Sequence, residues 1–433
     1  FVLFGTLGIS MYGQRETAYK GDNIAERSKV FWELIIIRTI TLSISMLLFY
    51  MIYGRIGEYT IYYRILLIQL VANLFDISWL FQGIEEFEKT VVRNLVVKLL
   101  SLILIFTVIK TPNDLWKYFA IYVGAELLGN ITLWLYLPQY IEKVSIKKLD
   151  LKKHIKPVIS LFLPQIAIQI YTVLDKTMIG VITKDMVEVG YYEQAQKVVK
   201  AALMITTALQ TVMNSRIANS YAQNDKQEIK KCLGISIDFV WFLTIPMMFG
   251  FFAISSKFVP WYYGDGFDGV TPILLATAPI LIAIGLNGIT GIQYLIQIGK
   301  QNVFTISVVI GAITNVIFNS ILIPFWGGVG AAIASTLAET AILIYQLKYF
   351  KEQYKISEML RMSIKCFISA FIMFIVVKII TNFLPVGILN TCIEILIGGI
   401  VYIVVLLILK YEFLKELTSL VINAVRGKIK CKN

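Results

Sequence analysis

Histidine and cysteine are scarce in this chain of 433 residues, which has one histidine and four cysteines. The cysteines lie far apart, without a CxxC pair, so the sequence offers neither a disulfide framework nor a zinc site. Charged residues are also few, at 16% of the chain against about 25% in soluble domains. These shortages argue against redox chemistry, against a metal centre and against a soluble enzyme.

Catalytic motifs are missing as well. There is no Walker A loop, and His154, the single histidine, lies in a lysine-rich segment without a nucleophile or partner beside it. Gly264, Gly266 and Gly269 match GxGxxG, but no strand is expected before them, and their sequence YYGDGFDGV is typical of a turn. We therefore expect a protein that is not an enzyme.

Apolar residues are abundant instead. They make up 57% of the chain, aromatic residues make up 13%, and the mean hydropathy is +0.73. Because a spanning helix needs about 20 mostly apolar residues, this composition predicts a polytopic, all-α membrane protein. Twelve complete spans are expected, at 31–53, 61–82, 91–109, 116–136, 158–182, 188–215, 232–254, 272–297, 303–323, 329–350, 362–381 and 390–410.

The formal net charge of +12 is explained by topology. When the segments between spans are assigned to alternate sides, 29 Lys and Arg fall on one side and 7 on the other. Positive charge accumulates in cytoplasmic loops, so the C-terminus is expected to be cytoplasmic. The segment 137–157, with six lysines, divides the chain as a basic linker, and a nucleic-acid partner is not expected.

An internal repeat supports two related bundles. Residues 11–29 and 213–231 carry Met, Arg, Tyr, Asp, Glu and Lys in the same order, and the spans that follow start 201 residues apart. The offset predicts that the first helix and part of the second precede Phe1. The expected domains are a truncated N-terminal lobe (1–136), a basic cytoplasmic linker (137–157), a C-terminal six-helix lobe (158–350), an extra helix pair (351–410) and a basic cytoplasmic tail (411–433).

Polar side chains recur at helical spacing in two adjacent spans. In the span 158–182 they are Gln165, Gln169, Thr172 and Lys176, and in the span 188–215 they are Glu193, Lys197, Lys200, Thr207, Thr211 and Asn214. Ionisable residues within spans are costly and mark candidate sites, so these stripes predict a wet interior. The alternative is that Glu193 and Lys197 form an ordinary i, i+4 pair and that the amides only join helices.

Five segments carry a family resemblance. They are YGQRE (12–16), DISWLFQGIEEF (76–87), LPQIAIQIYTVLDKTMIG (163–180), GYYEQAQKVVK (190–200) and YYGDGFDG (262–269). Together they resemble the polysaccharide flippases of the multidrug/oligosaccharidyl-lipid/polysaccharide transporter superfamily. The resemblance implies two pseudo-symmetric six-helix bundles facing each other in a V, a central cavity and two extra C-terminal helices.

The resemblance also implies the substrate, an oligosaccharide repeat unit on undecaprenyl pyrophosphate, which alternating access moves to the outer leaflet of a bacterial plasma membrane for polysaccharide synthesis. Membrane lipids, a polysaccharide polymerase and a chain-length regulator are the expected partners. No cofactor is implied, although coupling to a proton or sodium gradient is an open alternative. A lipid II flippase or a drug or cation antiporter of the same superfamily are the other readings.

Site residues follow from this resemblance and from the chemistry of the substrate. A diphosphate in a cavity of low dielectric constant needs cations, and the expected ones are Arg38, Lys176, Lys197 and Lys200. Sugars need amides and aromatic faces, for which the candidates are Gln165, Gln169, Tyr171, Gln194 and Asn287. Arg15 and Arg216 are candidates for headgroup capture on entry, although snorkelling anchors explain them equally well. The carboxylates that could couple to an ion are Asp175, Glu193 and Glu339.

Overall fold

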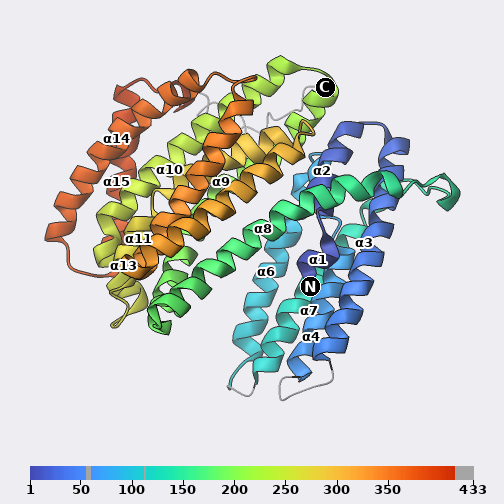
Figure 1. Cartoon of the computed structure of the whole chain (residues 1–433), viewed down its shortest axis with the longest axis horizontal. Coiled ribbons are helices and arrows are strands. Elements are labelled where there is room, and N and C mark those ends of the chain that lie inside the picture. Colours follow the sequence, from blue (N-terminus) through green and yellow to red (C-terminus); the bar gives the residue numbers. More distant parts are fainter. Residues whose placement is uncertain (55–59, 112–113, 415–433) are drawn as a thin grey trace. The chain divides into compact units, whose positions relative to one another are not determined.

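Helices form all of the regular structure in the described part of the chain. The computed structural model describes residues 1–54, 60–111 and 114–414 (Figure 1). A π-helix, Gly288–Ile296, continues α12. The helices are α1 (Val2–Thr6), α2 (Ile9–Lys20), α3 (Ile24–Tyr53), α4 (Thr60–Phe75), α5 (Ser78–Gly83), α6 (Phe87–Val108), α7 (Leu115–Trp134), α8 (Lys152–Thr183), α9 (Met186–Ala222), α10 (Lys226–Tyr263), α11 (Val270–Thr277), α12 (Ile280–Asn287), α13 (Gln301–Phe350), α14 (Ile356–Phe383) and α15 (Ile388–Ile408).

The helices confirm an all-α polytopic membrane protein. Within the described residues nine helices are long and apolar enough to cross a membrane, or ten if α11 and the bent continuation through α12 count as one span. Ten of the twelve expected spans each fall on a single helix, whereas 61–82 is divided between α4 and α5, and 272–297 between α11, α12 and the π-helix. Fewer long apolar helices are found than the twelve expected spans because α13 contains two of these spans, and because α9 carries the polar stripe that lowers its hydropathy.

A sharp bend at Gly327 divides α13 between its two expected spans. Gly327 has φ 51° and ψ −127°, a left-handed conformation that glycine adopts without steric cost. The side chain of Glu188, at the start of α9, accepts a hydrogen bond from the Gly328 N–H at 2.8 Å. A Cβ on Gly327 would lie 1.9 Å from this carboxylate, so a larger residue would strain the backbone and displace Glu188.

The chain folds into two compact units. Unit 1 consists of residues 1–166, 211–225 and 297–305, and unit 2 consists of residues 167–210, 226–296 and 306–433, of which the structure describes those up to 414. Helices α8 and α9 therefore each contribute residues to both units. The lobe, linker and tail boundaries expected from the sequence stay predictions.

Local signals position the helices of unit 1. Asn23 caps α3, because its side chain accepts a hydrogen bond from the Glu26 N–H at 3.1 Å. Asp76 lies at the break between α4 and α5, where its Oδ1 accepts from the Ser78 N–H at 3.0 Å. Helix α7 packs against both α4 and α6, and α2 packs against α3 and α5. This arrangement places polar residues at the break against the long helix α3.

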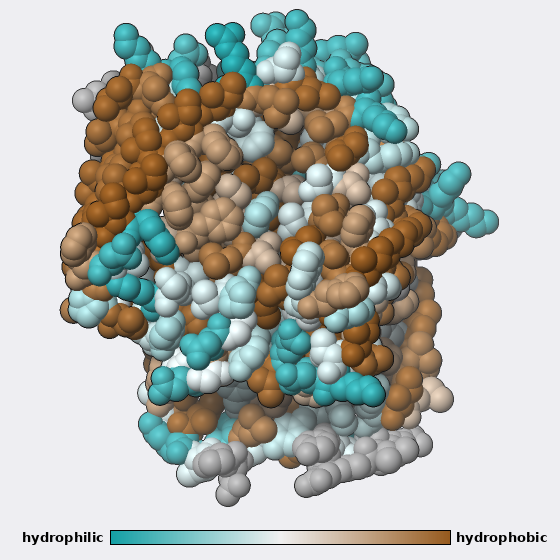
Figure 2. All heavy atoms as spheres, turned by 60° about the vertical axis from the view of Figure 1, so that its left-hand side comes forward, coloured by the Kyte–Doolittle hydropathy of each residue, from teal (hydrophilic) through white to brown (hydrophobic). Residues whose placement is uncertain are grey.

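Unit 2 is built around α10, which packs against α14, α15, α11 and α12. Its exterior is apolar, with Ile364, Phe371, Leu396 and Ile400 among the exposed side chains of α14 and α15. Figure 2 shows brown, hydrophobic side chains over a broad area of one face, with hydrophilic side chains gathered along its rims. Such a surface matches contact with lipid rather than water.

His154 corrects one expectation about the basic linker, because it has partners. Its Nδ1 lies 2.8 Å from the Tyr12 hydroxyl, and its Nε2 lies 2.7 Å from Glu33 Oε2. The Lys153 ammonium is 2.9 Å from the same oxygen, and Glu33 Oε1 accepts from the Asp150 N–H at 2.7 Å. His154 is 2% exposed and Glu33 is 0% exposed. The end of the linker is therefore anchored to α2 and α3 inside unit 1.

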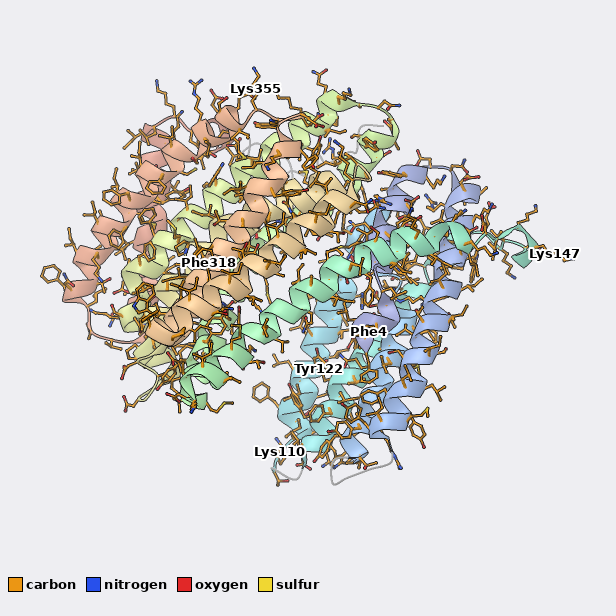
Figure 3. The ribbon with its side chains drawn as sticks, viewed as in Figure 1. Phe4, Lys110, Tyr122, Lys147, Phe318 and Lys355 are labelled. Carbon is orange, nitrogen blue, oxygen red and sulfur yellow. The ribbon has the colours of Figure 1, made fainter. Side chains whose placement is uncertain are left out.

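We predict that His154→Ala destabilises the protein, because it leaves the Tyr12 hydroxyl and one Glu33 contact without a buried partner. The expected loss is about 1–3 kcal/mol in the free energy of unfolding, measured by denaturant titration in detergent. Lys147→Ala is the matched control, since Lys147 is exposed on the same segment and is directed away from the ribbon (Figure 3). Equal stability of the two variants would contradict the anchoring role.

Candidate functional site

A cavity of about 130 Å³ in unit 2 collects most of the ionisable residues predicted from the sequence. It lies between α8, α9, α12 and α13. Six predicted residues line it, namely Asp175, Lys176, Glu193, Lys197, Lys200 and Glu339, together with Tyr192, Gln196, Val199, Leu203, Ile280, Ile284 and Ser335. Three lysines and three acidic residues give the lining a formal charge of zero.

The spacing on α9 explains why its charged residues share this cavity. Glu193, Lys197 and Lys200 are at i, i+4 and i+7, which is one face of an α-helix. Helix α8 contributes Lys176, whose ammonium lies 3.4 Å from Glu193 Oε1. Both side chains of this pair are more than one-third exposed, so the pair contributes little stability and can exchange partners.

Lys197 and Lys200 are the cations of this cavity that have no acidic partner. Both side chains are exposed, and no carboxylate of a described residue lies within 4.0 Å of either ammonium. They are one helical turn apart, so both can reach a single ligand. Each ammonium offers three donors and a full positive charge, which is the chemistry that binds phosphate oxygens.

Asp175 lies at the inner wall of the cavity, 3% exposed. Its Oδ2 accepts from the hydroxyls of Tyr192 and Ser335, both at 2.8 Å, and its Oδ1 accepts from the Asn319 amide at 2.7 Å. The Asn319 amide also donates to Asn315 Oδ1 at 3.0 Å. All three donors to Asp175 are neutral, and the Asn319 Oδ1 is buried without a donor. The cluster thus concentrates oxygen atoms where a cation or a proton could bind.

Glu339 and Asn287 form a second polar contact in unit 2. The Asn287 amide donates to the Glu339 carboxylate at 2.7 Å and to its backbone carbonyl at 2.9 Å, and both residues are buried. The Gln194 carbonyl accepts from the Tyr263 hydroxyl at 3.1 Å, which leaves its half-buried side chain for other contacts. Gln169 is exposed on α8.

Two candidates for sugar contact remain, Gln165 and Tyr171, of which Gln165 is not among the residues that line the cavity of unit 2. Gln165 belongs to unit 1, where its amide lies 3.7 Å from the Met11 sulfur. The Tyr171 side chain lies outside the described residues.

Arg38 is the one predicted cavity cation that belongs to unit 1. It is 1% exposed, donates to the Asp76 carbonyl at 2.9 Å, and lies 3.7 Å from Asp76 Oδ2. The guanidinium therefore holds the break between α4 and α5 against α3. This burial favours a structural role over contact with a ligand.

The two arginines at the repeated helix ends differ in their surroundings. Arg15 is buried, donates to Gln301 and to Glu16 at 2.9 and 3.1 Å, and stacks on Tyr12 and Tyr19. Its donors are engaged inside unit 1, which makes capture of a headgroup costly.

Arg216, the repeat counterpart of Arg15, is exposed. Burial raises the pKa of the nearby Glu85 carboxyl, and the positive charge of Arg216 opposes that rise. Of the two entry candidates, only Arg216 has a guanidinium exposed for a ligand.

A second polar cavity, of about 460 Å³, was not predicted from the sequence. It lies in unit 1 against α6 and α7 and is lined by Asp76, Arg93, Lys98, Glu126 and Asn130, with Ser78, Asn94, Ser101 and Tyr122 among the others. Arg93 donates to Asn130 Oδ1 at 2.5 Å. The available signal was Arg93, Asn94, Lys98 and Ser101, which recur at helical spacing within an otherwise apolar span.

We predict that the cavity of unit 2 contains water. In a background without the native cysteines, Lys197→Cys should react with a water-soluble maleimide in membranes, whereas Ala195→Cys should react at least about tenfold more slowly, because Ala195 is buried on the same helix. The measurement is the rate of labelling by mass spectrometry. Similar slow rates at both positions would contradict an aqueous cavity.

Comparisons with known proteins agree with this architecture. A family model described as "Polysaccharide biosynthesis protein" matches residues 1–214, about half of the chain. A Shigella dysenteriae protein named as an O-antigen transporter is 22% identical over 76% of this chain and 82% of its own length. The lipid II flippase MurJ of Bacillus subtilis is 24% identical over 50% of this chain and 42% of its own length.

Solved structures share the fold. A structure of the lipid II flippase MurJ in an inward closed conformation aligns with a TM-score of 0.60 and 18% identity, over 95% of this chain and 93% of its own. An outward-facing multidrug resistance transporter of the MATE family aligns with a TM-score of 0.69 and 13% identity, over 83% and 86% of the two chains. The solved structures show the fold, and the family model together with the O-antigen transporter relative supports the predicted likeness of this chain to the polysaccharide flippases of the multidrug/oligosaccharidyl-lipid/polysaccharide transporter superfamily.

Proposed function

We propose that the protein is a flippase that moves undecaprenyl-pyrophosphate-linked oligosaccharide repeat units from the cytoplasmic to the outer leaflet, for polysaccharide synthesis. The observation that carries the proposal is the pair of cations without acidic partners, Lys197 and Lys200, in a cavity within the membrane-spanning helices. An anionic headgroup is the ligand that such a pair selects. The names of the relatives, an O-antigen transporter and a lipid II flippase, support a lipid-linked glycan.

The diphosphate is the part of this substrate that is hardest to move through a membrane. Two ammonium groups in a hydrated cavity between the helices would offset its desolvation by charge-assisted hydrogen bonds. Lys176 can add a third cation if its weak pair with Glu193 opens. The glycan would contact the side chains of Gln169 and Gln194, while Asn287 is already engaged by Glu339.

Transport in this proposal is by alternating access and involves no covalent chemistry. The protein would be a multi-pass protein of a bacterial plasma membrane with a cytoplasmic C-terminus, as the distribution of Lys and Arg indicates. A polymerase and a chain-length regulator would act on the product. Arg216, which is exposed, remains the entry candidate of the proposal.

A drug or cation antiporter is the second candidate function. It is favoured by the acidic residues Asp175, Glu193 and Glu339, which equal the lysines of the same cavity in number. A cationic substrate would be bound by these carboxylates and repelled by Lys197 and Lys200, so the two candidates make opposite demands on the same residues.

We also propose that the Asp175 cluster couples transport to a sodium or proton gradient. A buried carboxylate without a cationic partner is costly, and Asp175 is held only by Tyr192, Ser335 and Asn319. A sodium ion prefers oxygen ligands, and the oxygens of Asp175, Asn319 and Asn315 are gathered here. Protonation of Asp175 would remove the same cost without a metal.

One prediction of the proposed function concerns the substrate. In proteoliposomes with the full-length protein, Lys197→Gln and Lys200→Gln should each lower the rate of leaflet transfer of undecaprenyl-pyrophosphate oligosaccharide by roughly tenfold to a hundredfold, the worth of a hydrogen bond to a charged group. Lys351→Gln, which removes an exposed cation outside the cavity, should leave the rate unchanged.

Three other outcomes decide between the alternatives. Efflux of a cationic dye without transfer of the lipid-linked sugar would assign the protein to the antiporters. Transfer of lipid II in preference to the repeat unit would change the glycan but keep the flippase. Full transfer by the double lysine variant would remove both residues from the site.

A further prediction of the proposed function concerns the coupling of transport to an ion gradient. Asp175→Asn keeps the shape of the side chain, removes its charge and replaces one acceptor oxygen with an N–H donor, to which the Tyr192 and Ser335 hydroxyls can adapt by accepting. It should abolish the acceleration of transfer by an imposed sodium or proton gradient while leaving slow, gradient-independent transfer. Glu193→Gln, which changes an exposed carboxylate in the same cavity, should keep the acceleration. An Asp175→Asn variant that still responds to both gradients would refute the coupling role.

A further inference from the structure

Unit 2 contains a second cavity, on the side of α10 that faces α14 and α15, with a volume of about 490 Å³. Its lining is almost wholly apolar, and it shares no lining residue with the cavity that contains Lys197 and Lys200. Most of the lining side chains are half-buried, so it is a groove rather than a closed void. The walls include Phe242, Pro246, Met247, Val377, Ile395 and Tyr402.

One carboxylic acid lies in this apolar groove. Glu394, in the second turn of α15, is 1% exposed, and neither of its carboxylate oxygens has a hydrogen-bond partner. Neither nearby hydroxyl donates to this carboxylate: Thr391 accepts from the Trp261 indole at 2.7 Å, and Tyr402 donates to the Phe242 carbonyl at 3.0 Å. Burial of an acid without any partner is among the costliest arrangements in a protein, so it calls for an explanation.

The shape of the groove is maintained by two glycines. A Cβ on Gly250 of α10, or on Gly399 of α15, would meet no atom within 4 Å, although glycine is a poor helix former. Gly398, by contrast, packs closely, because its Cβ would lie 3.0 Å from Val377. Gly250 and Gly399 therefore widen the groove rather than permit close helix packing.

The acid lies toward one end of this groove. Glu394 and Ile403 both line it, and nine residues of α-helix separate them by about 14 Å. Between them the α15 wall offers only apolar surface and Tyr402, whose hydroxyl is engaged. A ligand that fills the groove must therefore have a polar end at Glu394 and an apolar chain along α15.

We propose that this groove binds a single-chain amphiphile with a protonated amine head, with the ammonium against Glu394 and the alkyl chain along α10 and α15. An ammonium neutralises the carboxylate and has three N–H donors, enough for both oxygens. A hydroxyl head has one donor and leaves an oxygen without a partner, and a carboxylate head is repelled. The proposal does not depend on the flippase function, because it concerns a different cavity.

The test uses three photoreactive probes with the same dodecyl chain and a diazirine near its end: an amine, an alcohol and a carboxylic acid. The full-length protein in lipid nanodiscs is irradiated with each probe, and labelled peptides of α10 and α15 are quantified by mass spectrometry. The amine should label these peptides roughly tenfold or more above the other two, which is the effect of one hydrogen bond to a charged group.

Variants test the contact of the headgroup and the binding of the chain in the groove separately. Glu394→Gln should bring amine labelling down to that of the alcohol, and Gly399→Leu, which fills the groove, should abolish labelling by all probes. Gly250→Leu repeats the second test from α10 in case Gly399→Leu does not fold. Glu352→Gln removes an exposed carboxylate and should change nothing.

Two results would overturn the proposal. Equal labelling by the three probes in the unaltered protein would indicate a site for apolar chains alone, such as the polyprenyl tail of a substrate. Preference for the amine that survives Glu394→Gln would place the head elsewhere.

Discussion

The cost of an unpaired charge in hydrocarbon governs where the ionisable side chains of this protein lie. Arg38 offsets this cost by its ion pair with Asp76, and Asp175 offsets it by accepting hydrogen bonds from three neutral donors. Those contacts, in turn, determine backbone geometry: the Arg38 pair holds the break between two helices of unit 1, and the Asp175 cluster ties α8 to α9 and to both halves of α13. Among the described residues that line the two cavities of unit 2, Lys197, Lys200 and Glu394 have no partner of opposite charge, and they are the residues from which ligands are inferred.

The arrangement of helices could largely be predicted, because a membrane permits few alternatives. Backbone groups in hydrocarbon must bond within their own segment, so long apolar stretches become helices, and every expected span is helical, although 61–82 and 272–297 are broken into shorter helices. Local breaks within the helices could not be predicted from the sequence. The bend at Gly327 depends on Glu188, 139 positions earlier in the chain, and the π-helix Gly288–Ile296 has no recognisable sequence signal.

Helical spacing predicted which residues share a cavity but not which of them are free to act. Of the ten residues in the stripes on α8 and α9, four line one cavity, namely Lys176, Glu193, Lys197 and Lys200. Arg38 was predicted as a cavity cation and Arg15 as an entry residue, yet both are buried with partners from distant segments. His154 was misjudged for the same reason, since Glu33 and Tyr12 are more than 120 positions away. Periodicity reports the face of a helix, whereas pairing depends on tertiary neighbours that spacing does not reveal.

The two cavities of unit 2 place opposite charges in different surroundings, and this difference gives each its own selectivity. In the cavity with Lys197 and Lys200 the lysines are exposed and acids are close by, so an anion of the proposed kind would be attracted without being held irreversibly. In the groove of α15 the single acid is buried and has no counter-charge, so only a ligand that supplies one, and that can also fill an apolar channel, gains from binding. If both proposals hold, one helical unit binds two classes of amphiphile that differ in the sign of the head.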